Sequence, residues 1–279
     1  MLTGGDRADK RRARPPVDRR APVLLVALGV ATLALLVLPT AVLLARGLAP
    51  GSIGMLLRPA AAEALRLSLV TTLASMSIVV LLGTPLAYLL ARHEFRGRRL
   101  LDALVDLPLL LPPVIAGVGL LLVFGRRGLI GAPLAEMGVN IAFTSWAVVM
   151  AQVFVASPFF VRALKSGFAS VPGELAAAAL MDGASRFRMF VSVFFPLALP
   201  AFIEGLVLAW ARALAEFGAT IVFAGSLQGR TRTLPLAVYA ALESDLNSAI
   251  ALSALLTVMS VTVFVVFRAV VARRVERAL

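Results

Sequence analysis

The stretch ELAAAALMDGASRFRMFVSVFFPLALP, residues Glu174–Pro200, decides the fold of this chain. Its first part is a short polar segment that separates two long apolar blocks. Five charged residues lie in this segment or shortly before it: Lys165, Glu174, Asp182, Arg186 and Arg188. Because charged side chains are costly in hydrocarbon, the segment is predicted to leave the membrane and to meet something outside the lipid.

The local pattern of this stretch predicts two short helices joined by a bend. Ala176–Leu180 is rich in alanine, the strongest helix former. Gly183 can adopt the left-handed conformation that ends a helix, and Ser185 is placed to cap the next one. Pro196 suits the first turn of a following helix, where its missing N–H costs nothing, and Pro200 is predicted to kink that helix.

Composition places the chain in a membrane. Its 279 residues are 60% hydrophobic and 15% charged, with a mean hydropathy of +0.95, which excludes a soluble globular domain. Cysteine is absent, so disulfides, thiolate metal sites and iron–sulfur clusters are excluded. His93, the only histidine, lies in a basic loop and is predicted to be solvated. The sequence therefore predicts no metal site and no cofactor.

Six apolar blocks are long enough to cross a bilayer, which takes about 20 helical residues. They are residues 22–44, 64–90, 103–124, 141–164, 197–225 and 248–267. The prediction is an all-α membrane protein with six transmembrane helices, the first of which is an uncleaved span and not a signal peptide. The predicted organisation is a disordered basic tail (1–21), a first helix with an outward loop (22–62), a five-helix core (63–267) and a C-terminal tail (268–279).

Lysine and arginine are divided unevenly between the two sides of this topology. Nineteen lie in the N-terminal tail and in segments 92–99, 162–188 and 268–277, whereas six lie in the segments on the opposite side. Positive charge beside a span marks the cytoplasmic side, so both termini and the polar segment are predicted to be cytosolic. The net charge of +12 then follows from topology and requires no nucleic-acid partner. Binding of the basic tail to anionic lipid stays open.

Several predicted spans contain helix breakers. They are Gly83 and Pro85 in the second span and Pro108, Pro112 and Pro113 in the third. A proline inside a membrane helix frees carbonyl groups that neighbouring helices or water must satisfy. These spans are therefore predicted either to face a bundle interior or cavity, or to carry simple packing kinks. Two outward segments, 132–137 and 233–247, are predicted to form short helices.

The fifth predicted span carries unusual charges. Four residues recur at every fourth position and form one row on a helix face: Glu204, Leu208, Arg212 and Glu216. Arg212 and Glu216 can neutralise each other, and Asp106 in the third span is a further possible partner for Arg212. The alternative is a direct role in guiding an anion. The candidate pathway residues are Arg212, Glu216, Thr220 and Asp106.

Eight residues of the opening stretch keep a characteristic spacing: Ala178, Ala179, Gly183, Phe190, Val193, Pro196, Leu197 and Pro200. This spacing resembles the signature of the permease subunits of ATP-binding-cassette (ABC) importers, in which Glu-Ala-Ala is followed by Gly and by Leu-Pro-Leu. Ala177 stands where the family has Glu, and Phe195 stands where it has the first Leu. The alternative to a permease signature is an ordinary amphipathic loop between helices.

In that family the loop is a coupling element that docks into a groove of a cytosolic ATPase. The resemblance therefore implies a coupling loop at about residues 165–195. The residues that it assigns to coupling are Glu174, Ala178, Ala179, Gly183, Ala184, Ser185, Phe190, Pro196, Leu197 and Pro200.

A second set of residues narrows the resemblance. It comprises Arg212, Ala213, Glu216, Phe217, Gly218, Ala219, Thr220, Phe223, Ala224, Gly225, Thr233, Leu234, Pro235, Leu236, Tyr239, Glu243 and Ser244. Together with residues 106–128, this set resembles the molybdate/tungstate permeases of the sulfate and molybdate branch, and the likeness covers residues 63–267. It implies a type I importer bundle that carries an oxyanion, with molybdate or tungstate as the first expectation. Sulfate or thiosulfate is the alternative, because sulfate and molybdate are both tetrahedral dianions.

ATP hydrolysis is expected on another chain. The two lysines, Lys10 and Lys165, do not follow the glycine-rich pattern of a phosphate-binding loop, and no set of catalytic residues is evident. The resemblance implies as partners a second permease copy in a homodimer, cytosolic ABC ATPase subunits, an extracytoplasmic substrate-binding protein and the lipid of the inner membrane. Two other classes remain. An ion-coupled secondary transporter would show paired internal repeats or broken helices in both halves, and no convincing repeat is found. A membrane-embedded enzyme would need a nucleophile or metal.

Overall fold

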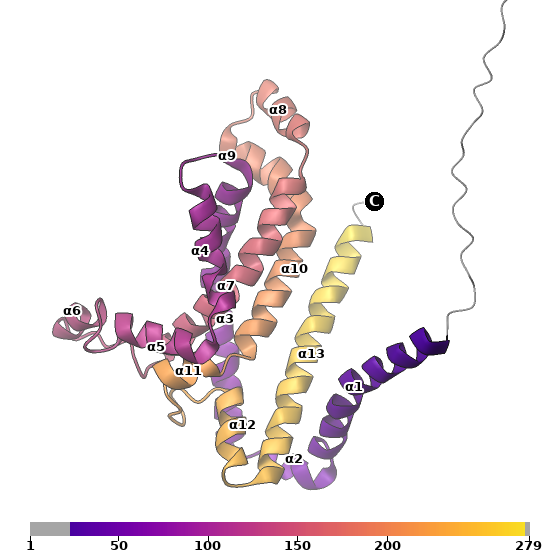
Figure 1. Cartoon of the computed structure of the whole chain (residues 1–279), viewed down its shortest axis with the longest axis vertical. Coiled ribbons are helices and arrows are strands. Elements are labelled where there is room, and N and C mark those ends of the chain that lie inside the picture. The colour runs from indigo at the N-terminus through magenta and orange to yellow at the C-terminus, as the bar shows by residue number, and fades with distance from the viewer. Residues whose placement is uncertain (1–22, 277–279) are drawn as a thin grey trace, which may run out of the picture. The chain divides into compact units, whose positions relative to one another are not determined.

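The computed structural model describes residues 23–276, and within this range every regular element is a helix and no strand occurs. Figure 1 shows the arrangement. In chain order the elements are α1 (Val23–Gly47), α2 (Pro50–Leu56), α3 (Pro59–Arg92), α4 (Arg98–Leu110), α5 (Pro113–Phe124), α6 (Gly131–Glu136), α7 (Ser145–Ser170), α8 (Gly173–Met181), α9 (Arg186–Met189), the π-helix η1 (Phe190–Phe194), α10 (Phe195–Leu214), α11 (Gly218–Phe223), α12 (Leu234–Leu242) and α13 (Leu246–Glu276). Two compact units divide the chain between Val42 and Leu43.

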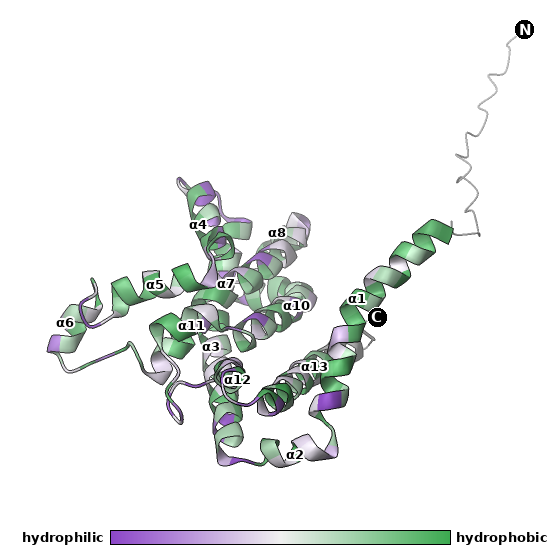
Figure 2. Ribbon diagram, turned by 60° about the horizontal axis from the view of Figure 1, so that its bottom comes forward, coloured by the Kyte–Doolittle hydropathy of each residue, from purple (hydrophilic) through white to green (hydrophobic). Residues whose placement is uncertain are grey.

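Most of α1 lies in the first unit and is apolar on every side. Residues 23–42 are all exposed, and Figure 2 shows this helix predominantly in the green of hydrophobic residues. Thr32 and Thr40 satisfy their hydroxyl groups by donating to carbonyl oxygens one turn earlier. A helix that is apolar all round is typical of a membrane span, as predicted for residues 22–44. The predicted basic tail (1–21) lies outside the described residues.

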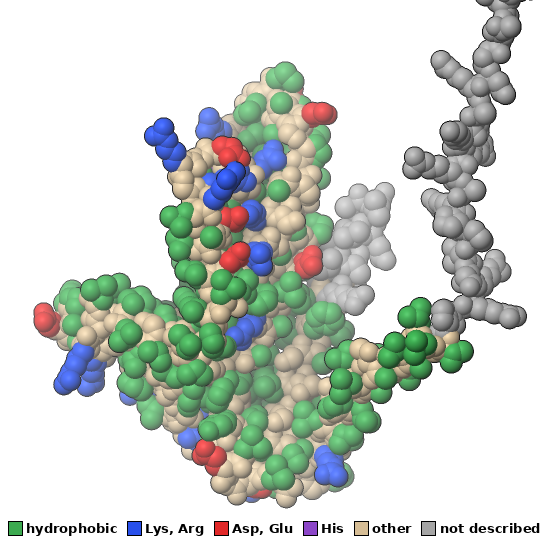
Figure 3. Space-filling model, in the orientation of Figure 1, with side chains coloured by type: hydrophobic (Ala, Val, Ile, Leu, Met, Phe, Trp, Pro, Cys, Tyr) green, Lys and Arg blue, Asp and Glu red, His purple; other side chains and the backbone are tan. Residues whose placement is uncertain are grey.

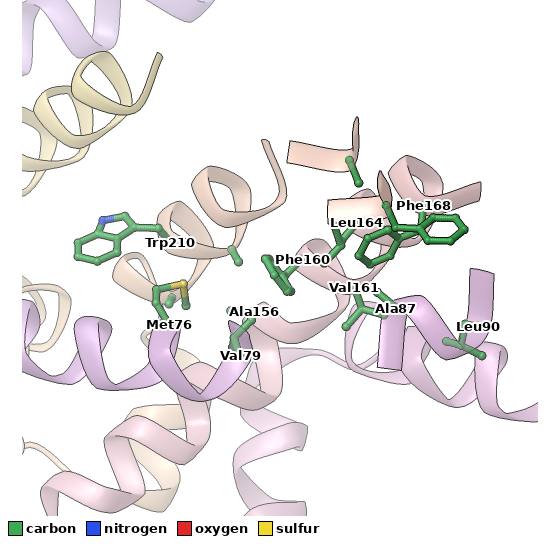
Figure 4. Packing of buried hydrophobic residues seen from close by; sticks show 14 of the residues in the cluster. Met76, Val79, Ala87, Leu90, Ala156, Phe160, Val161, Leu164, Phe168 and Trp210 are labelled. Carbon is green, nitrogen blue, oxygen red and sulfur yellow. The ribbon is translucent and has the colours of Figure 1, made fainter. Parts of the chain in front are cut away.

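The second unit is built around α7, which packs against both α3 and α10. Figure 4 shows Phe160 and Phe168 of α7 in the resulting cluster, together with Val79 of α3 and Trp210 of α10. The two phenylalanine side chains are fully buried. Because lipid is as apolar as these side chains, close packing, and not removal from water, holds these helices together.

Four predicted spans correspond to single long helices, the third to a bent helix pair and the fifth in part to the helical stretch Arg186–Leu214. The first, second, fourth and sixth predicted spans are α1, α3, α7 and α13. α13 continues through Glu276, so residues 268–276 of the predicted C-terminal tail are helical. The two short outward helices are also present, as α6 and α12.

The third predicted span is broken into α4 and α5, whose axes differ by 115°. Leu111 has extended backbone angles, as expected for a residue before proline. Pro112 and Pro113 have no N–H to donate to the carbonyl groups one turn earlier, so the helix ends and a new one starts. Consecutive prolines at this point therefore change the direction of the chain and do more than kink one helix.

The fifth predicted span (197–225) is wrong in its outward part. The helical stretch begins already at Arg186 and ends at Leu214, and the separate helix α11 follows. α11 packs closely on α5: a Cβ added to Gly117 would lie 2.7 Å from the carbonyl oxygen of Ala219. The two short helices α5 and α11, each of which follows a break in a predicted span, thus pack against each other.

Candidate functional site

The predicted coupling loop is a protrusion formed by α8 and α9 between the ends of α7 and η1. In Figure 1 it lies at the end of the second unit, beyond the adjacent ends of α7 and α10. Figure 3 shows that charged side chains gather over this end, around α4, α8 and α9. The two-helix form that the sequence predicts is therefore present, and it is accessible from outside the bundle.

Backbone hydrogen bonds end α8 in a Schellman motif. The N–H of Ala184 donates to the carbonyl oxygen of Ala179, and the N–H of Gly183 donates to that of Leu180, both at 3.0 Å. Gly183 has φ = +79°, a left-handed conformation that costs glycine little. Ser185 then caps α9 by accepting a hydrogen bond from the N–H of Arg188 at 3.2 Å. Both local predictions from the sequence are confirmed.

The two faces of α8 differ. Ala176 and Ala179 are partly buried against the main hydrophobic cluster, which includes residues of η1. The opposite side of α8 and the following helix α9 expose large apolar side chains, among them Met181 at 82% and Phe187 at 77%. Isolated apolar residues are common on surfaces, but these lie together on a short protrusion next to the charged side chains that gather around α4 and α9. Such a surface is suited to contact with another protein.

The other predicted coupling residues do not converge on one spot. Phe190 belongs to the cluster beneath α8, whereas Glu174, Ala178 and Leu197 are exposed. Pro196 and Pro200 both lie within α10, and the helix passes through the π-turn of η1 just before them. There, the N–H of Phe195 donates to the carbonyl oxygen of Phe190. A π-turn fits this position because Pro196 has no N–H with which to continue the regular pattern.

Arg212 and Glu216 form an ion pair with 2.8 Å between Nη1 and Oε2. The side chain of Glu216 is fully buried, and its Oε1 accepts a hydrogen bond from the N–H of Ala219 at 2.7 Å, at the start of α11. The predicted row on one helix face holds for Glu204, Leu208 and Arg212 within α10. It is wrong for Glu216, because α10 ends at Leu214 and Glu216 lies in the junction beyond it. The predicted pairing of the two charges is confirmed.

The predicted contact between Asp106 and Arg212 is wrong. Asp106 pairs instead with Arg162 of α7, at 3.0 Å between Oδ1 and Nε. One turn closer to the start of α4, Asp102 pairs with Lys165 at 2.5 Å. Two ion pairs thus join α4 to α7, with their carboxylates four residues apart on α4 and their basic residues three apart on α7. Arg212 instead pairs with Glu216 at the end of α10.

Of the candidate pathway residues, Glu216 and Thr220 are buried. Glu216 lies at the α10–α11 junction and Thr220 in α11, whereas Asp106 is partly exposed and pairs with the exposed Arg162 on a different helix pair. The geometry therefore assigns the Arg212–Glu216 ion pair a structural role in shaping the α10–α11 junction. In the described residues, no three His, Asp or Glu side chains are placed to hold a metal ion.

Residues 83–277 match the family described as "Binding-protein-dependent transport system inner membrane component". The chain belongs to this family. It is 42% identical over 249 residues to the molybdenum transport system permease protein ModB of Mycobacterium tuberculosis, a match that covers 89% of this chain and 94% of that protein. It is also 37% identical over 196 residues to a probable sulfate transport system permease protein cysT of Nephroselmis olivacea, covering 68% and 69% of the two chains.

Solved structures show the same fold. A bacterial ABC transporter involved in alginate import superposes with a TM-score of 0.71 at 16% identity, over 90% of this permease and 95% of that chain. A bacterial alginate ABC transporter in complex with an alginate-bound periplasmic protein gives 0.69 at 15% identity, over 91% and 94%. The chain is therefore a multi-pass permease subunit of an inner-membrane ABC importer with the type I fold, and it is not the ATPase.

Sequence reasoning missed several polar residues of the permease. Gln152 is buried in α7 and accepts a hydrogen bond from the hydroxyl group of Ser75 in α3 at 2.7 Å. Arg162, the partner of Asp106, lies in the same helix. A polar or charged residue within an apolar span was the available signal, because such residues are rare there and need partners.

Proposed function

We propose that this permease carries a tetrahedral oxyanion, molybdate or tungstate, into the cytosol, driven by an ATPase docked on α8 and α9. The substrate class is supported by the relative named as a molybdenum permease, which matches almost the whole chain. The match to a probable sulfate permease covers less of the chain at lower identity, so sulfate is the second candidate.

The exposed two-helix protrusion is the observation that carries the coupling proposal. It joins α7 to the helical stretch that includes α10, and these two helices form the most extensive contact of the bundle. Closure of an ATPase dimer on the protrusion would move both helices together. Because ATP must favour one of two bundle states, the protrusion has to transmit a difference in interaction free energy, which a rigid two-helix element can do.

The remaining parts of the assembly belong to the same proposal. A second copy of the permease completes the pathway as a homodimer, and a substrate-binding protein docks on the outward side. The end that carries α8 and α9 faces the cytosol, together with both chain termini, in agreement with the distribution of lysine and arginine. Alternating access then opens the bundle outward when ATP binds and inward after hydrolysis.

The test is uptake by proteoliposomes that contain the permease, its co-purified ATPase and the binding protein. We expect ATP-dependent uptake of labelled molybdate that unlabelled tungstate inhibits and sulfate inhibits poorly. Preferential inhibition by sulfate would show that sulfate, and not molybdate, is the substrate. Uptake without the ATPase would overturn the proposed function.

Substitution at Gly183 tests the coupling protrusion itself. Proline is restricted to φ of about −65° and cannot adopt the +79° found here, so Gly183→Pro should abolish docking of the ATPase or uncouple hydrolysis from uptake. Gly173→Ala is the matched control, because a Cβ at Gly173 meets open space in α8. Normal coupled uptake in Gly183→Pro would contradict the proposed role of the protrusion.

A further inference from the structure

We infer that Arg92, supported by Tyr88, is a positioning residue that fastens both ends of the coupling protrusion to α3, so that α3 moves with it. The inference rests on the proposed coupling function and names the connection through which the movement reaches a third helix. Neither residue lies in the coupling signature, and both belong to the last turns of α3.

Arg92 contacts the chain on both sides of the protrusion. Its Nη1 donates a hydrogen bond to the carbonyl oxygen of Val171 at 3.0 Å, directly after the end of α7. Its guanidinium carbon lies 4.5 Å from the ring centroid of Phe194, the last residue of η1. Arg92 of α3 therefore contacts the residues that immediately precede and follow segment 172–193, which includes α8 and α9.

Tyr88, one turn earlier in α3, forms a second connection. Its ring makes near-perpendicular contacts with Phe168 of α7 and with Phe190 and Phe194 of η1, at centroid distances of 5.4, 5.0 and 5.4 Å. Edge-to-face pairs of this kind are each worth about 0.5–1.5 kcal/mol beyond area burial. Tyr88 thus joins the same two chain segments as Arg92.

Burial makes these contacts strong. Phe168 and Phe194 are fully buried, and a cation above a ring gains strength when water is excluded. Among the described residues no carboxylate forms an ion pair with Arg92, so its charge is directed to the carbonyl oxygen and the ring. A lysine could keep the positive charge, but it could not present a planar group to ring and carbonyl at once.

The consequence is a longer path for the movement. Without this connection a movement of the protrusion reaches α3 only through the apolar packing of α3 against α7, α8 and α10. α3 runs from Arg92 to Pro59, which at 1.5 Å per residue is about 50 Å, and contacts α12 as well as α7. Arg92 and Tyr88 therefore extend the coupling movement to the helix that reaches the outward end.

The experiment compares Arg92→Gln and Tyr88→Leu with Tyr88→Phe, which keeps the ring. Arg96→Gln is the control, because Arg96 is an exposed arginine in the loop that follows α3. The full complex with its ATPase is reconstituted, and molybdate uptake and ATP hydrolysis are measured together. We expect Arg92→Gln and Tyr88→Leu to bind the ATPase and hydrolyse ATP, but to move about tenfold less molybdate per ATP, within the usual range of coupling energies. Tyr88→Phe and Arg96→Gln should match wild type.

Unchanged uptake per ATP in Arg92→Gln and Tyr88→Leu, beside a coupled wild type, would overturn this inference alone. Loss of ATPase binding in these variants would also overturn it, because the residues would then be needed for docking and not for transmission. A wild-type complex without ATP-driven uptake would overturn the proposed function, and the inference with it.

A distance measurement tests the inference without either variant. The chain has no native cysteine, so spin labels can be placed at Arg96→Cys, beyond α3, and Asp182→Cys, at the end of α8. If Arg92 fastens the protrusion to α3, the distance between the labels stays the same with and without bound ATP. A change of about 5 Å, one helical turn, would overturn the inference.

Discussion

The short helices α9 and α11 lie at opposite ends of the fifth span, and their starts are held in opposite ways. α9 begins at an exposed serine, Ser185, whose neutral hydroxyl group accepts one backbone hydrogen bond. α11 begins beside a fully buried glutamate, Glu216, which accepts a backbone hydrogen bond and pairs with Arg212. The difference shows which break is free to contact another chain and which is fixed within the bundle.

The physical basis is the cost of burying charge. A buried carboxylate is tolerated only where a charged partner and hydrogen bonds offset its desolvation, so Glu216 fixes the position of Arg212 and of the first turn of α11 together. A serine cap in water imposes no such requirement. The break at α9 can therefore be displaced at low cost, whereas the break before α11 cannot move without exposing an unpaired charge.

Removing the buried carboxylate should have the largest effect. Glu216→Leu leaves Arg212 without a partner and the N–H of Ala219 without an acceptor, so we expect a loss of about 3–5 kcal/mol in stability. The measurement is thermal unfolding of the purified permease in detergent. Arg212→Met combined with Glu216→Leu should recover much of the loss, because no unpaired charge then remains. An unchanged unfolding temperature in Glu216→Leu would contradict the structural role of the pair.

Removing the exposed cap should have a smaller and local effect. Ser185→Ala deletes the acceptor for the N–H of Arg188 and should cost about 1 kcal/mol, confined to α9. Hydrogen exchange should become faster at residues 186–189 while α11 is unchanged. Ser185→Asp keeps an acceptor and serves as the control. Faster exchange at α11 would show that the two breaks are not independent.

The exposed ion pair between Asp106 and Arg162 tests whether burial makes the difference at Glu216. Asp106→Asn removes the negative partner of Arg162, whose side chain is 61% exposed, so water can solvate the remaining charge. We expect a change of at most about 1 kcal/mol, well below the effect at Glu216. Thermal unfolding of both variants in the same detergent provides the test, and equal losses would show that burial does not separate the two pairs.

The smallest effect concerns a third helix start. The hydroxyl group of Ser248 donates to Asp245 at the start of α13 and lowers the pKa of this carboxyl, and the N–H of Asn247 donates to it as well. A lowered pKa stabilises the folded state above the ordinary carboxyl pKa, and this contribution is lost as the pH falls through the folded-state value. Ser248→Ala should therefore lower the unfolding temperature slightly at neutral pH and not at strongly acidic pH. A difference that persists at acidic pH would point to lost packing instead.

Local physics explains which parts of the site could be predicted from the sequence. The ends of α8 and α9 depend on residues within one turn, so Gly183 and Ser185 were sufficient to predict them. The break after Leu214 was harder to predict, since the apolar run continues through α11 and hydropathy alone does not register a bend. Gly218 was the signal for close packing at that point, because a Cβ added to it would lie 2.8 Å from the Cβ of Pro113.

The sequence by itself determined the membrane class, the six apolar blocks, the polar protrusion and the family, because hydropathy, charge distribution and motif spacing are properties of neighbouring residues. Only the tertiary structure decided which charges meet. Asp106 pairs with Arg162 and not with Arg212, and Arg92 reaches both ends of the protrusion. These contacts depend on how far each helix extends and how it is rotated against the next, which packing of the whole bundle sets and no local pattern encodes.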